Sequence, residues 1–111
     1  MSLKDEISQL GIRQSQDPES ASVVAVLVRD LNAEDIARLK LWLNEGKVIL
    51  TVAAEGVKGA ENVARLQAEL AGSAVASRVA IIVKNATGDD AVVMPYSLEN
   101  KAEALSFALS L

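Results

Sequence analysis

The stretch Ile49 to Leu70, ILTVAAEGVKGAENVARLQAEL, decides the fold because it joins two different hydrophobic patterns through a short glycine-containing loop. Its first part is a continuous apolar run, which is typical of a strand buried on both faces of a sheet. From about Ala60 to Ala71 the apolar residues recur with the spacing of an amphipathic helix. A buried strand followed directly by such a helix is the repeating unit of α/β proteins, so the stretch predicts that class.

The same alternation extends over most of the chain. Strands are predicted for residues 22–30, 47–55, 77–85 and 91–97. A helix is predicted between Asn32, a favourable N-cap residue, and Gly46, which ends it. A further helix is predicted from Ser97 to the end of the chain. The short turn NATGDD, residues 85–90, predicts an antiparallel hairpin, because a parallel return needs a long crossover.

These elements predict a single-domain α/β sandwich over residues 22–111, with the order (α)-β-α-β-α-β-β-α. Strands that alternate with helices favour parallel crossovers. We therefore expect a mixed, mainly parallel four-stranded sheet with helices packed on it, in which only the last strand is antiparallel. Residues 1–21 predict a short helix followed by a polar linker or arm. That arm is either a frayed tail or a segment that docks on this domain or on a second subunit.

The composition restricts the chemistry. The 111 residues include no cysteine and no histidine. Disulfides and thiolate chemistry are therefore excluded, and the commonest general base and metal ligand are missing. The sequence contains no metal-ligand spacing and no clear nucleophile–base pair, so we expect no catalytic residue, no metal and no cofactor. An enzyme that uses paired Asp or Glu carboxylates stays an open alternative.

The charge and the hydropathy pattern bear on the partner. The net charge of −4 does not favour a nucleic-acid partner, which normally meets a basic patch, although a local basic cluster would permit one. The apolar runs are too short to span a membrane. The first residues lack the pattern of a secretory signal, so a cytoplasmic location without membrane contact is expected.

One candidate ligand site lies at the predicted strand ends. Gly56, Lys58 and Gly59 follow a strand and precede a helix, where backbone N–H groups can cradle a phosphate. Arg29 and Lys84 end two other strands and would complete a polar rim. The loop matches neither G-x-x-x-x-G-K-[ST] nor G-x-G-x-x-G, and glycine also serves ordinary turns. A phosphate cradle and a simple corner therefore both remain open.

A candidate interface lies on the predicted helices, which carry more apolar surface than one sheet face can cover. The segment LKLWL, residues 39–43, is apolar at nearly every position and includes Trp42. The predicted C-terminal helix adds Leu105, Phe107 and Leu109. Surplus apolar helix surface indicates contact with a partner, unless the N-terminal arm covers it.

The run LNEGKVILTVAAEG, residues 43–56, resembles the helix–strand–glycine passage of Alba-type nucleic-acid-binding proteins. The overall order of elements is similar to that of the anticodon-binding domain appended to some class II aminoacyl-tRNA synthetases. Neither similarity extends to specific motifs. They therefore imply a topology and do not transfer a function.

Together these patterns favour a non-catalytic protein–protein interaction or dimerisation domain, acting as an accessory module of a larger assembly. Its expected partner is a second copy of the chain or another protein. The alternative is an α/β domain that binds a nucleotide, a phosphate or RNA through the strand-end loops.

Overall fold

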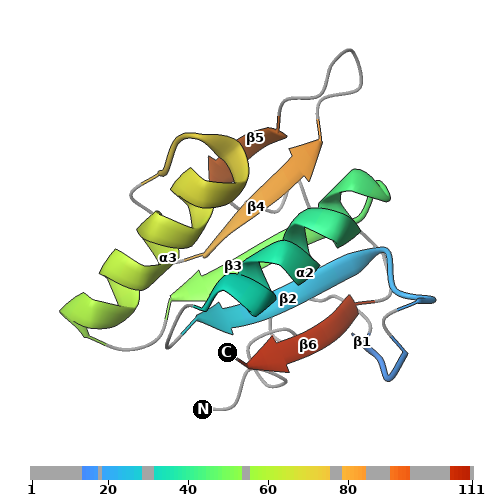
Figure 1. Ribbon diagram of the computed structural model, residues 1–111. Helices are drawn as coiled ribbons and strands as arrows, with labels where there is room; N and C mark the ends of the chain where they lie inside the picture. The colour runs from blue at the N-terminus through green and yellow to red at the C-terminus, as the bar shows by residue number, and fades with distance from the viewer. Residues whose placement is uncertain are drawn as a thin grey trace.

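The computed structural model describes residues 14–17, 19–28, 32–53, 56–75, 79–84, 91–95 and 106–110 (Figure 1). The strands are β1 (Gln14–Ser15), β2 (Val23–Val28), β3 (Val48–Ala53), β4 (Val79–Lys84), β5 (Ala91–Pro95) and β6 (Ser106–Ser110), and the helices are α2 (Ala33–Asn44) and α3 (Val57–Ala71). The strands of these residues form one mixed sheet with the order β1-β6-β2-β3-β4-β5. Both described helices lie on the same face of it (Figure 1). The predicted α/β class is therefore confirmed.

The centre of the sheet is buried on both faces. β2 and β3 pair in parallel and in register, from Val23 beside Val48 to Val28 beside Ala53. The face under the helices contributes the buried residues Val24, Val26, Val28, Ile49, Ala53 and Ile82, which pack with residues of α2 and α3. The opposite face contributes the buried residues Val23, Ala25, Leu50, Val52 and Ile81. Burial on both sides explains why these strands are continuous apolar runs rather than alternating ones.

Helix α2 begins and ends where the sequence predicts. The Asn32 side-chain oxygen accepts a hydrogen bond from the backbone N–H of Asp35 at 2.9 Å, which caps the helix. After the helix, Gly46 adopts a φ of +92°, a conformation that favours glycine. The helix turns Leu39, Trp42 and Leu43 into the core.

The chain reverses direction after helix α3, and this sets the direction of β4. Gly72 caps the helix in the left-handed conformation, with a φ of +76°. The backbone N–H of Val75 then donates to the Gln67 side-chain oxygen at 3.1 Å, so the chain turns back along the helix. This return brings the start of β4 to the end of β3, where Val79 pairs with Val52. β4 therefore runs antiparallel to β3, and the predicted parallel third strand is wrong.

The sequence predicted four strands, now β2 to β5, and their pairing directions differ from the prediction. Among them only β2 and β3 pair in parallel, while the β3–β4 and β4–β5 pairs are antiparallel. The mixed character of the sheet and the β4–β5 hairpin are confirmed. The mainly parallel four-stranded sheet is wrong.

The predicted C-terminal helix is also wrong where the structure describes it. Residues Ser106–Ser110 form strand β6, which pairs in parallel with both β2 and β1. The sequence SFALS is a short apolar run between two serines, and a run of this kind fits a strand as well as a helix. The predicted element order therefore ends in a strand instead of a helix.

Part of the predicted N-terminal arm contacts the domain. Gln14 and Ser15 form β1 and pair with β6. Further along, the Lys47 ammonium donates to the backbone oxygens of Ala21 at 2.7 Å and of Glu19 at 3.4 Å. The predicted short helix before this segment lies outside the described residues.

Candidate functional site

The two lysines of the polar rim predicted at the strand ends lie at opposite ends of the sheet. Gly56 and Lys58 lie at the carboxyl end of β3, at the start of α3. Lys84 lies at the other end of the sheet, because β4 is antiparallel and its Ile82 pairs with Ile49 near the start of β3. Arg29 lies outside the described residues. The reversal of β4 thus separates two lysines that a parallel sheet would have placed together.

The glycines of the predicted phosphate loop have a local structural explanation. Gly56 adopts a φ of +91° at the N-cap of α3, a conformation that L side chains rarely adopt. Gly59 is buried within the first turns of the helix. The loop turns the chain from strand to helix, and Lys58 extends into solvent beside it.

Among the predicted interface residues, Trp42 is the one whose side chain the structure describes. Trp42 is only 5% exposed and packs in the core of this chain. The guanidinium carbon of Arg38 lies 4.6 Å from the centre of its ring and covers part of it. Leu105 lies outside the described residues, and Phe107 and Leu109 belong to β6, of which the backbone alone is described.

The large apolar side chain that α2 exposes is Leu41, the residue before Trp42. Leu41 is 58% exposed, on the side of α2 opposite its buried residues. Ala33 and Ala37 precede it at four-residue spacing and are also exposed, so the three form one stripe on the outer surface of α2. The exposed apolar stripe of this helix therefore runs through Leu41 and does not include Trp42.

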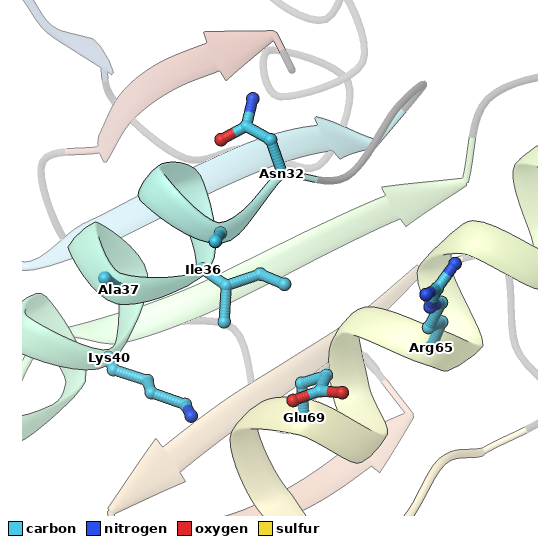
Figure 2. Close-up of a pocket in the computed structure, with 7 residues that line it drawn as sticks. Asn32, Ile36, Ala37, Lys40, Arg65 and Glu69 are labelled. Carbon is cyan, nitrogen blue, oxygen red and sulfur yellow. The ribbon is translucent and has the colours of Figure 1, made fainter.

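A groove of about 460 Å³ lies between the outer surfaces of α2 and α3 (Figure 2). It is lined by Asn32, Ala33, Ile36, Ala37, Lys40, Arg65 and Glu69. Alanine and isoleucine side chains from α2 provide its apolar part. Helices α2 and α3 lie side by side on one face of the sheet (Figure 1). The space between their outer surfaces is therefore an open channel and not an enclosed cavity.

Charged side chains of both signs border the groove. Lys40 reaches from α2 toward α3, and Glu69 projects from α3 into the same space, with Ile36 nearby (Figure 2). Arg65 lies one helical turn before Glu69. Among the described residues, none of these three charged groups has a hydrogen bond or an ion pair. The groove thus presents unpaired positive and negative charge around an apolar centre.

A smaller hollow of about 160 Å³ adjoins the groove at Lys40. Lys84 lines it together with Asn44, the last residue of α2, and Leu70, which lies close to the end of α3. The C-terminal ends of helices carry partial negative charge and attract cations. Lys84, on β4, therefore lies close to helix ends that favour a positive charge.

A second exposed apolar position lies on the edge of the sheet. β5 is the last strand in the sheet order and contains no charged residue. Its Val92 is 42% exposed. Edge strands without charges can pair with another strand, so β5 is a competing candidate surface.

The described parts of the chain contain neither a cluster of metal ligands nor a membrane-spanning helix. No group of three acidic side chains there is close enough to hold a metal ion. No helix among these residues is both long and apolar enough to cross a membrane. Comparison with protein-family models, with characterised proteins and with solved structures gave no significant match to this chain.

Proposed function

We propose that this protein is a non-catalytic protein–protein interaction domain whose contact surface is the outer side of α2 and α3. The observation that carries the proposal is the exposure of Leu41 beside the groove between these helices. Burial of an exposed leucine and of the adjoining alanine stripe removes apolar area from water, which is the main driving force of association. The charged border supplies complementary contacts around that apolar centre.

The alternative function, a phosphate or RNA site at the strand ends, has less support. Lys58 and Lys84 lie at opposite ends of the sheet, so they cannot contact one small anion together. The groove is also a poor enzyme site, because Glu69 is the one carboxylate among its lining residues and acid–base catalysis by carboxylates uses a pair.

The proposal is tested with a photo-crosslinking amino acid placed at position 41 and, as the matched control, at position 57. Val57 is 76% exposed at the start of α3 and does not line the groove, so a reagent there meets solvent. Irradiation of cells that express the full chain should give one adduct of discrete mass from position 41 and none from position 57. Equal labelling at both positions, or no adduct at position 41, would contradict the proposal.

A further inference from the structure

We propose that the partner of the α2–α3 surface is a second copy of this chain, related to the first by a two-fold axis. This inference rests on the proposed function and adds the identity of the partner. In such a pair the same surface of both copies is used, so each contact occurs twice. The surface must therefore be complementary to itself in shape and in charge.

The shape of the surface meets this requirement. Leu41 projects from the outer stripe of α2, and the apolar lining of the groove begins one helical turn away at Ala37. A two-fold axis between them places the Leu41 side chain of each copy over the groove of the other. The apolar part of the groove, at Ile36 and Ala37, then receives a leucine instead of water.

The charges of the surface are also complementary to themselves under a two-fold axis. A groove with charges of one sign would repel its own copy, whereas this groove carries Lys40 on one wall and both Arg65 and Glu69 on the other. Under the two-fold axis the Lys40 ammonium of each copy meets the Glu69 carboxylate of the other, which gives two equivalent ion pairs. Within the described residues neither group has a partner in its own chain that it would have to give up.

The experiment uses two charge-reversal variants, Lys40→Glu and Glu69→Lys, and measures dimer dissociation constants by sedimentation equilibrium. Each variant alone places like charges together at both equivalent contacts. We expect self-association of either variant to weaken by about tenfold or more, since each exposed pair changes from weakly attractive to repulsive.

An equal mixture of the two variants should regain the affinity of the parent protein. In the mixed dimer the new carboxylate at position 40 of one chain faces the new ammonium at position 69 of the other. The second contact keeps the original pairing, because each chain still carries one unchanged member of the pair. Both contacts of the mixed dimer are therefore attractive, as they are in the parent.

The matched control mixture is Lys58→Glu with Glu45→Lys, which changes the net charges of the two chains by the same amounts. Lys58 and Glu45 are exposed at helix ends, where the new charges suit the helix dipoles, and neither lines the groove. Both control variants should dimerise like the parent. Far-ultraviolet circular dichroism confirms that all variants are folded.

Four results would overturn the inference. A parent protein that stays monomeric up to high micromolar concentration excludes the second copy as partner. A mixture of Lys40→Glu and Glu69→Lys that remains as weak as the separate variants shows that the two residues do not meet between copies. Loss of the dimer through Val92→Lys, with no effect of either charge reversal, assigns the association to the β5 edge. If the crosslink from position 41 leads to a different protein, the interaction surface stands and the self-pairing fails.

Discussion

Two polar side chains lie fully buried in the described core and connect three elements. Gln67 of α3 donates through its amide nitrogen to the Thr51 hydroxyl at 3.0 Å. The Thr51 hydroxyl donates in turn to the backbone oxygen of Ala80 at 3.2 Å. The Gln67 oxygen accepts from the backbone N–H of Val75. The pair thus links α3 to β3, to β4 and to the returning loop, and each buried polar group has a partner.

Thr51→Val should reduce the free energy of unfolding by about 1–3 kcal/mol, because it leaves the Gln67 amide buried with no acceptor. Urea denaturation measures the change. The double variant Thr51→Val/Gln67→Met removes both partners with apolar groups of similar shape and should regain part of the loss. Equal stability of Thr51→Val and the parent, or strict additivity in the double variant, would show that the hydrogen bond does not stabilise the fold.

The exposure of Leu41 can be predicted from the sequence by the angular spacing of residues around a helix. Successive residues of a helix are rotated by roughly 100°, so Leu41 lies roughly 200° from Leu39. It therefore lies opposite the buried side of α2, whereas Trp42 is close to it. The prediction named Trp42, the largest side chain of the segment, which lies in the core of this chain. The groove itself could not be predicted, because it depends on where α3 lies beside α2.

Helix α2 depends on its N-terminal cap, since it carries both Leu41 and one wall of the groove. Asn32→Ala removes the side-chain acceptor for the backbone N–H of Asp35 and should cost about 0.5–2 kcal/mol of stability. Asn32→Asp keeps an acceptor and adds favourable negative charge at the helix start, so its stability should be close to that of the parent. Thermal unfolding followed by circular dichroism distinguishes the two. An Asn32→Ala protein as stable as Asn32→Asp would refute the capping role.

The turn after α3 decides the direction of β4 and with it the placement of Lys84. The sequence contains Gly72, and a helix end there could be predicted. The direction of the strand that follows could not, because it depends on the contact between Val75 and the Gln67 side chain. A rule that favours parallel crossovers predicts the wrong direction where a local hydrogen bond turns the chain back.

Gly72→Ala should destabilise the protein by about 1–2 kcal/mol, the strain of an L side chain in the left-handed conformation. No heavy atom lies within 4 Å of the position where its Cβ would be, so crowding adds nothing to that strain. Gly72→Asn should cost less, because asparagine tolerates this conformation better. Chemical denaturation of both variants provides the comparison. A loss for asparagine as large as that for alanine would point to a cause other than backbone strain.

The chain as a whole follows its hydrophobic pattern at the centre and departs from it at the ends. Continuous apolar runs correctly predicted β2 and β3, because a strand buried on both faces leaves such a run. The runs for β4 and β5 were also read correctly as strands, although β5 lies at the sheet edge and is partly exposed. Strand β6 was predicted as a helix, since a five-residue apolar segment fits either structure until its neighbours are known. Its place beside β2 depends on a contact between the two ends of the sequence, which local patterns do not contain.

The mass of the unmodified chain in solution tests the central claim most directly. Light scattering coupled to size exclusion, over a series from low to high micromolar concentration, reports whether one chain or two move together. We expect a mass that rises to that of two chains and no further, because a two-fold pairing closes on itself. The mass of a single chain at every concentration would contradict it.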